Sequence, residues 1–246
     1  MMSLRYTLRA IIVDLFRAVV SIKFILSVVC GVAVLLLIAQ QHIWDEGASV
    51  TYIISWCTIE SLYMSFFILP SLPYSGSYVM DYNSKFLVQS KIRVGRKAYA
   101  VSKAVATAVA GALSMLLSYL IIISILAVVL PIQSAYIIDA EGYEQWILNG
   151  QPFMFLASKT MLAMFMGALV AEFSLWASAH IQNQLVIVIS PVIAFYTQDI
   201  ICYLMGIGNI SYVSLSAIIF YTPGFTSLAL CLGHSCGCLL YTSRCV

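Results

Sequence analysis

The sequence predicts an all-α integral membrane protein. We expect a polytopic helical bundle with five full transmembrane helices, a truncated sixth and an N-terminal interfacial amphipathic helix. Composition is the first reason: 62% of the 246 residues are hydrophobic and 9% are charged, whereas about 25% are charged in soluble globular proteins. Mean hydropathy is +0.99. A chain of this size cannot hide so much apolar surface from water, so lipid is expected to surround most of it.

Apolar stretches of spanning length are the second reason. A spanning helix needs roughly 20 mostly apolar residues. Five stretches meet this length, at 21–40, 50–72, 100–130, 153–179 and 184–205, and the fifth contains Pro191, which predicts a kink. A sixth stretch, 213–233, is interrupted by Pro223 and Gly224. Membrane β-barrels show short alternating strands instead, so the pattern favours helices.

The placement of charge predicts the orientation. Six of the twelve basic residues lie between positions 85 and 103, and four more precede or begin the first apolar stretch. The segments 41–48 and 131–152 carry acids and no base. Loops rich in Lys and Arg belong in the cytoplasm. We therefore expect a multi-pass protein of the bacterial plasma membrane with a cytoplasmic N-terminus, residues 73–100 in the cytoplasm and residues 131–152 outside.

Residues 1–20 show the spacing of an amphipathic helix. Apolar residues recur every three or four positions, at Leu4, Leu8, Ile11, Ile12, Leu15 and Val19, while Arg5, Arg9, Asp14 and Arg17 fill other positions. This pattern predicts a helix lying in the membrane interface, with its bases near anionic headgroups. The alternative is that the first span starts early with a charged flank.

Nothing in the chain predicts an enzyme, a metal site or a cofactor. The motifs H-E-x-x-H, G-x-S-x-G and G-x-x-x-x-G-K-[ST] do not occur. Near the C-terminus Cys231, Cys236, Cys238 and Cys245 gather around His234, but their spacing fits no tetrahedral zinc motif. The string "CLLYTS", Cys238 to Ser243, is the translation of TGTCTCTTATACACATCT, which resembles a sequencing-library adaptor. We expect residues 238–246 to be a non-native, adaptor-derived tail.

Three acids fall within predicted spans: Glu60, Glu172 and Asp199. Intramembrane carboxylates are costly and often mark a transport pathway or a proton relay. Glu172 and Asp199 are therefore possible pathway residues. Hydrogen bonding at a helix interface is the alternative for each.

The run "LPSLPYSGSYVMDYNSKFLVQSKIRVGRKAYAVSK", residues 69–103, resembles part of a known family. In this run an acid follows the second span, then comes a basic stretch, and then an aromatic residue and a Lys lead into the third span. This order of residues resembles that of the ATP-binding cassette (ABC) transporter permeases of the type-2 exporter family. Asp81 takes the acidic position, Arg93, Arg96 and Lys97 the basic stretch, and Tyr99 and Lys103 the last two. The resemblance extends over residues 1 to about 235. It implies that residues 1–237 form the transmembrane domain. The incomplete sixth span departs from the family pattern.

The resemblance implies a permease subunit of an exporter with no ATP site of its own. A separate ABC ATPase subunit would dock on the cytoplasmic loop 73–100, and a second permease subunit would complete the path. The coupling residues it implies are Asp81, Lys85, Lys91, Arg93, Arg96, Lys97, Tyr99 and Lys103. Membrane lipid is expected as a partner and nucleic acid is not. Two alternatives are a proton-coupled secondary transporter using Glu172 and Asp199, and a non-transporting membrane immunity or scaffold protein.

Overall fold

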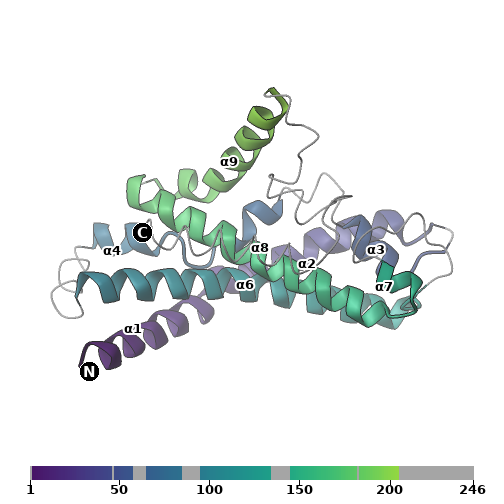
Figure 1. Ribbon diagram of the computed structural model, residues 1–246, viewed down its shortest axis with the longest axis horizontal. Coiled ribbons are helices and arrows are strands. Elements are labelled where there is room, and N and C mark those ends of the chain that lie inside the picture. The colour runs from purple at the N-terminus through teal and green to yellow at the C-terminus, as the bar shows by residue number, and fades with distance from the viewer. Residues whose placement is uncertain are drawn as a thin grey trace.

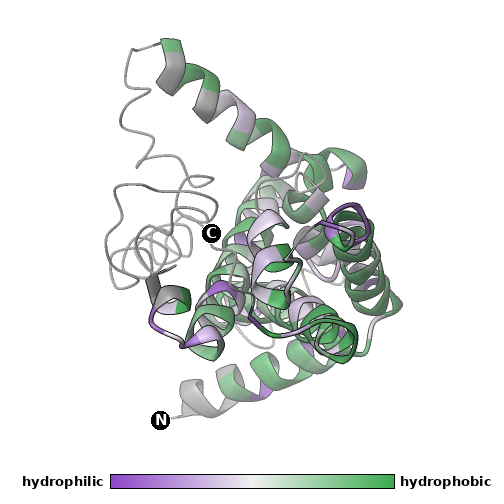
Figure 2. Cartoon of the chain, turned by 90° about the vertical axis from the view of Figure 1, so that its right-hand side faces the viewer, coloured by the Kyte–Doolittle hydropathy of each residue, from purple (hydrophilic) through white to green (hydrophobic). Residues whose placement is uncertain are grey.

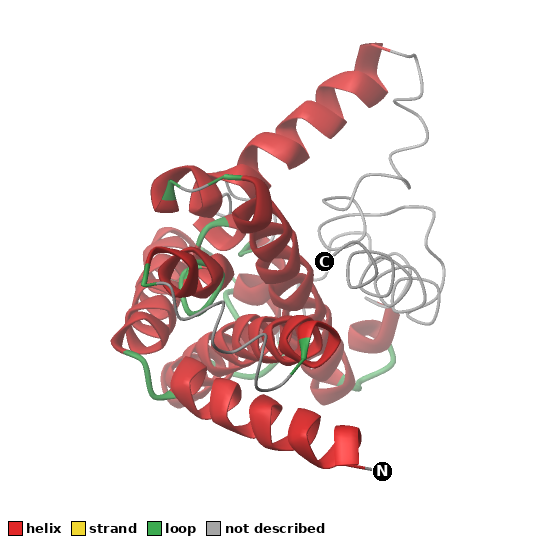
Figure 3. Cartoon of the chain, turned by 90° about the vertical axis from the view of Figure 1, so that its left-hand side faces the viewer, coloured by secondary structure: helices red, strands yellow, loops and turns green. Residues whose placement is uncertain are grey.

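The described part of the chain is helical throughout. The computed structural model describes residues 2–45, 47–57, 65–84, 95–133, 145–181 and 183–204. Every regular element in these ranges is a helix (Figure 3), in agreement with the predicted all-α fold. Three long helices, α2 (Ile22–His42), α6 (Arg96–Val129) and α8 (Pro152–His180), run along the long axis of the molecule (Figure 1).

These three helices account for three of the predicted spans. Ile22–His42, Ala98–Val129 and Pro152–His180 are each long and apolar enough to cross a membrane. Hydrophobic residues extend along their length (Figure 2) and include many outward-facing side chains, such as Val29, Leu120 and Met161. An apolar exterior is unfavourable in water and favourable in lipid, so the fold is that of a membrane protein. Five full spans remain a prediction.

The predicted second span, 50–72, is built from shorter pieces. Helix α3 (Val50–Trp56) ends before Cys57, and the 3-10 turn η2 (Leu69–Ser71) holds Pro70. Proline has no backbone N–H, so Pro70 and Pro73 favour turns over a continuous helix here. Residues 58–64, with Glu60 among them, lie outside the described residues. The short helix α4 (Ser77–Asn83) follows the turns.

Helix α9 (Gln184–Leu204) covers the predicted fifth span and contains Pro191. It packs against α8 near its start and then projects from the bundle (Figure 1). The predicted sixth stretch 213–233 and the tail 238–246 lie outside the described residues.

Helix α1 (Met2–Val19) is a separate helix and not an early start of the first span. Ser21 caps α2, because its Oγ accepts a hydrogen bond from the backbone N–H of Phe24 at 3.2 Å. One face of α1 packs on α6, where Ala18 is fully buried. The other face leaves Ile12 and Phe16 exposed. Amphipathic character is therefore confirmed, and the interfacial position remains a prediction.

Helices α6 and α8 approach each other closely at two glycines. A Cβ added to Gly111 would lie 2.5 Å from the carbonyl oxygen of Gly167, and one added to Gly167 would lie 2.5 Å from that of Gly111. Only glycine lets the two backbones approach so closely. Ala171 also lies at this crossing, since a Cβ on Gly111 would lie 2.6 Å from the Cβ of Ala171.

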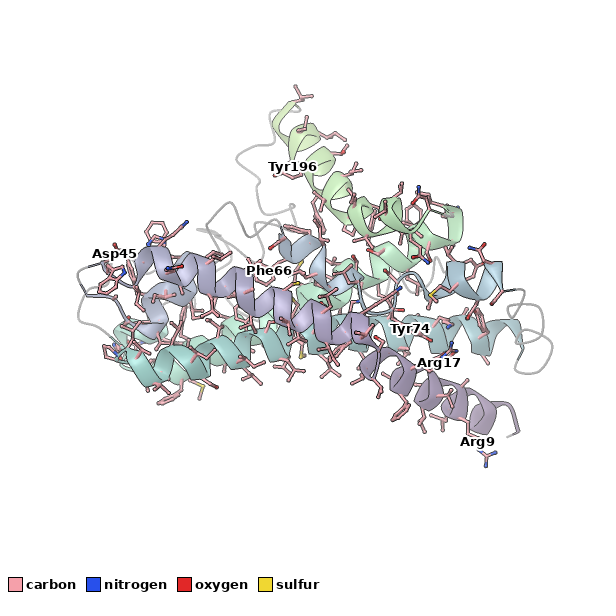
Figure 4. All side chains as sticks on the ribbon, turned by 180° about the vertical axis from the view of Figure 1, so that it is seen from behind. Arg9, Arg17, Asp45, Phe66, Tyr74 and Tyr196 are labelled. Carbon is pink, nitrogen blue, oxygen red and sulfur yellow. The ribbon has the colours of Figure 1, made fainter. Side chains whose placement is uncertain are left out.

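The two ends of the bundle differ in chemistry. At one end Nδ1 of His42 lies 2.9 Å from Oδ2 of Asp45, and the Tyr52 hydroxyl donates to the same oxygen at 3.2 Å. The His42 ring stacks on Trp56, with 4.8 Å between the ring centroids. Aromatic residues of this kind gather at membrane–water interfaces. The opposite end holds α1, α4 and the start of α6, and Figure 4 shows Arg9 and Arg17 there, far from Asp45.

Candidate functional site

A buried polar cluster joins α1, α4 and α6 at the end of the bundle opposite Asp45. We call it the Lys103 cluster; it consists of Asp14, Tyr74, Asp81, Tyr99, Ser102 and Lys103. Lys103 is 3% exposed, Asp81 5% and Asp14 8%. Charged residues are almost never buried this deeply unless they are paired, so the contacts of these three side chains determine what the cluster does.

Lys103 is the centre of the cluster. Its Nζ lies 2.9 Å from Oδ2 of Asp81 and 3.5 Å from Oδ1 of Asp14. It also donates a hydrogen bond of 2.8 Å to the hydroxyl oxygen of Tyr74. An ammonium group has three donors, and three oxygen atoms lie within 3.5 Å of this one. A lysine saturated in this way is a structural tie between elements and offers no free amine for chemistry.

The two carboxylates are held by further donors. Tyr74 donates to Oδ1 of Asp14 at 2.6 Å, and Ser102 donates to Oδ2 of Asp14 at 2.8 Å. Tyr99 donates to Oδ2 of Asp81 at 2.8 Å. Hydrogen bonds to charged groups contribute about 1.5–3 kcal/mol each. They therefore hold both carboxylates in place beside Lys103.

Tyr74 connects the cluster to the turns that follow η2. Burial is the main cause that raises the pKa of Tyr74 above its usual 10.0, and its hydrogen bond to Asp14 adds to the effect. The phenol therefore stays protonated, and it can donate to Asp14 while accepting from Lys103. Lys103 also lies over the Tyr74 ring, 4.6 Å from its centroid, which adds a cation–π contact.

The charges inside the cluster sum to one negative charge, since two carboxylates surround one ammonium group. Arg17, exposed on α1, lies near Tyr74 (Figure 4) and contributes a favourable positive potential there. Elements remote in sequence are thus held by one network: Asp14 comes from α1, Asp81 from α4 and Lys103 from α6. A movement of α4 would be transmitted to α1 and α6.

The structure brings together three of the residues that the family resemblance selected: Asp81, Tyr99 and Lys103. Arg96 and Lys97 lie in the first turn of α6, after Gly95, whose φ of 90° is in the left-handed region that favours glycine. The side chains of these two residues, and residues 85–94 with Lys85, Lys91 and Arg93, lie outside the described part of the chain.

Sequence reasoning missed three members of the cluster: Asp14, Tyr74 and Ser102. Asp14 was assigned to the polar face of α1, but it points to α6, where Ser102 and Lys103 bind it. A signal was present: Asp14 is the only acid among the first 44 residues, which carry four bases. Tyr74 lies in a turn, where hydrophobic periodicity does not predict which way a side chain points.

Glu172 lies apart from this cluster, on the face of α8 that packs against α6. It is 2% exposed, and neither carboxyl oxygen has a hydrogen-bond partner among the described residues. The carboxyl approaches the backbone of Ala108 without a well-formed hydrogen bond. An ionised carboxylate in this position would be strongly unfavourable, so the neutral acid fits the packing. Asp199 lies on α9, and its side chain is outside the described part.

Other chemistry has no support in the described ranges. No group of three His, Cys, Asp or Glu side chains within them could hold a metal ion. No family model, curated protein or solved structure matches the chain. Fold and site together define an all-helical membrane protein whose elements are tied at one end by a buried ion-pair cluster.

Proposed function

We propose that the chain is the membrane-spanning permease subunit of an ATP-driven ABC exporter. ATP would be hydrolysed by a separate ATPase subunit, and a second permease subunit would complete the path for the substrate. The family resemblance of residues 69–103 motivates this proposal. It is supported by the contact between Asp81 and Lys103, which are two of the residues that carry the resemblance.

The buried pair of Asp81 and Lys103 is the observation that carries the proposal. α4 is too short to be stable alone, and Asp81 ties it to α6. α6 has 34 residues and is therefore about 51 Å long at a rise of about 1.5 Å per residue. A long helix held at one end by an ion pair can carry a displacement across the membrane. A force applied to residues 78–97 by a docked ATPase would enter α6 through Lys103.

The cytoplasmic orientation is part of the same proposal. Arg9 and Arg17 lie at the same end of the bundle as α4 and the start of α6, whereas Asp45 lies at the other (Figure 4). Lys23 lies there too, since its Nζ is 4.0 Å from the sulfur of Met80 in α4. Positive charge favours the cytoplasmic side. The Lys103 cluster would then face the compartment in which the ATPase is found.

The proposal is tested by ATP hydrolysis in nanodiscs that contain the chain and an ABC ATPase subunit identified from a neighbouring gene. The chain should change the turnover of the ATPase several-fold. Asp81→Asn keeps the size of the side chain but removes its charge, and should abolish that change in a complex that still assembles. Asp45→Asn, at the opposite end, is the matched control and should behave as wild type. Equal behaviour of the two variants would count against coupling through α4.

Glu172 supports a second candidate, a proton-coupled secondary transporter. Its buried and unpaired carboxyl is the form of site that could bind and release a proton when α6 and α8 separate. Vesicles holding the chain alone, with entrapped pyranine, would report proton movement when candidate solutes are added. Movement that Glu172→Gln abolishes would favour this candidate. Export that needs the ATPase and survives Glu172→Gln would exclude it.

A further inference from the structure

A cavity of about 500 Å³ lies between α6 and α8, away from the Lys103 cluster. α6 contributes Leu116, Leu120, Ile123 and Ala127, and α8 contributes Phe153, Leu156, Ala157, Thr160, Met161 and Met164; Val50 and Ile132 close one end. Its volume is in the range of small-molecule sites, roughly 300–1,000 Å³. Neither the proposed coupling nor the packing of the bundle requires a cavity there.

The lining selects a ligand with no polar groups. Thr160 is the only residue of the lining with a hydroxyl, and it already donates to the carbonyl oxygen of Leu156 at 2.8 Å. No side chain of the lining is charged. A polar ligand would lose its hydrogen bonds to water without replacement. The site therefore fits a hydrocarbon chain.

The dimensions of the cavity match one leaflet of a bilayer. From Leu116 to Ala127 the wall covers about 17 Å of helix at about 1.5 Å per residue. Half of a hydrocarbon core of about 30 Å is about 15 Å. One end of the cavity lies where α6 ends and α8 begins, beside Ile132, and the other lies near the middle of both helices. A lipid chain that enters from the headgroup level would have this path.

The side of the cavity is open to the exterior of the bundle. Phe153 is 69% exposed, Leu120 47% and Met161 40%. These rim residues are continuous with other exposed apolar side chains on α6, including Leu117 and Ile121. α6 and α8 are both long and apolar enough to cross a membrane, and in a membrane the medium outside this rim would be lipid.

We propose that this cavity binds one acyl chain of a membrane lipid, drawn from the leaflet at the Asp45 end of the bundle. The chain lies between α6 and α8 along the wall from Ala127 to Leu116. Its headgroup stays at the level of Ile132 and Val50. The site requires only that α6 and α8 span the membrane, and it is independent of the proposed ATPase partner.

The test uses the full chain in phosphatidylcholine vesicles with a trace of a phosphatidylcholine that carries a diazirine near one chain terminus. After illumination, cross-linked peptides are mapped by mass spectrometry. Labelling should concentrate on Leu116 and Met164, at the deep end of the cavity. Ala157→Trp fills the cavity and should reduce this labelling at least five-fold, and Ala127→Phe provides a second filling variant.

Ala33→Trp, at an exposed position of α2, is the matched control and should leave the labelling unchanged. Circular dichroism and size exclusion establish that each variant is folded. Equal labelling of α2 and the cavity, unaffected by either filling variant, would indicate ordinary surrounding lipid and overturn the proposal. Weaker labelling of the cavity than of exposed α2 residues would mean that protein covers it, either another segment or a second copy, and would overturn it as well.

Discussion

Lys103 and Asp14 approach to 3.5 Å although they lie on different helices, and both are buried. The contact joins the N-terminal helix to the start of α6, while Asp81 binds the same ammonium group from α4. Replacing one charge in a buried pair costs about 3–5 kcal/mol because the other charge is left uncompensated. The cluster should therefore stabilise this end of the bundle and hold α1, α4 and α6 together.

Lys103→Met should lower the free energy of unfolding by about 3–5 kcal/mol, because two buried carboxylates lose their counter-ion. Chemical unfolding in detergent micelles, followed by circular dichroism, measures the change. Lys23→Met removes an exposed lysine and should change stability by less than about 0.5 kcal/mol. Adding Asp14→Asn and Asp81→Asn to Lys103→Met should recover part of the loss. A triple variant less stable than Lys103→Met would contradict the charge argument.

Tyr74→Phe should lower the free energy of unfolding by about 1.5–3 kcal/mol, because Asp14 loses a charge-assisted hydrogen bond. Tyr196→Phe, on the exposed part of α9, is the control and should be close to neutral.

The contribution of Tyr74 to the free energy of unfolding should depend on pH with a definite sign. The pKa of Tyr74 is raised in the folded state, so its contribution is present below about pH 10 and is lost as pH rises above it. Wild type should lose more stability than Tyr74→Phe between about pH 9 and pH 11; equal losses would contradict this assignment.

Gly111→Ala should destabilise the α6–α8 packing by about 1–3 kcal/mol, as overpacked contacts do. The new Cβ would lie 2.5 Å from a backbone oxygen and 2.6 Å from Cβ of Ala171, and neither atom belongs to a flexible side chain that could turn away. Gly76→Ala meets nothing within 4 Å and is the control. Thermal unfolding in detergent compares the two. Equal melting temperatures would mean that the helices are not in contact at Gly111.

Glu172→Met should raise the free energy of unfolding by about 1–3 kcal/mol, because it removes a buried group that has no hydrogen-bond partner in the described part of the chain. Glu172→Gln keeps a polar group there and serves as the comparison, with a smaller change. Both are measured by unfolding of the purified chain in detergent. A loss of stability in Glu172→Met alone would reveal a partner for the carboxyl in the assembled protein.

The sequence predicts the helical class well and the site only in part. Hydropathy alone locates α2, α6 and α8, since twenty apolar residues in a row have one stable form in lipid. It overestimates the continuity of 50–72, because a count of apolar residues does not register the 3-10 turns around Pro70. Family resemblance selects Asp81 and Lys103 but gives no contacts. Asp14 is missed because helical periodicity assigns a residue to one face of its own helix. It does not identify the residues of other helices that pack against that face.

The most direct measurement of the central proposal is site-specific photo-cross-linking in cells. A photoreactive phenylalanine analogue replaces Ser90, in the predicted cytoplasmic segment 73–100, or Ala48, at the opposite end of the bundle. The account predicts that illumination joins the Ser90 variant to a protein with a nucleotide-binding P-loop of the ABC ATPase class, and that the Ala48 variant gives no such product. No ATPase cross-link at Ser90, or equal cross-linking at Ala48, in chains inserted at normal levels would contradict it.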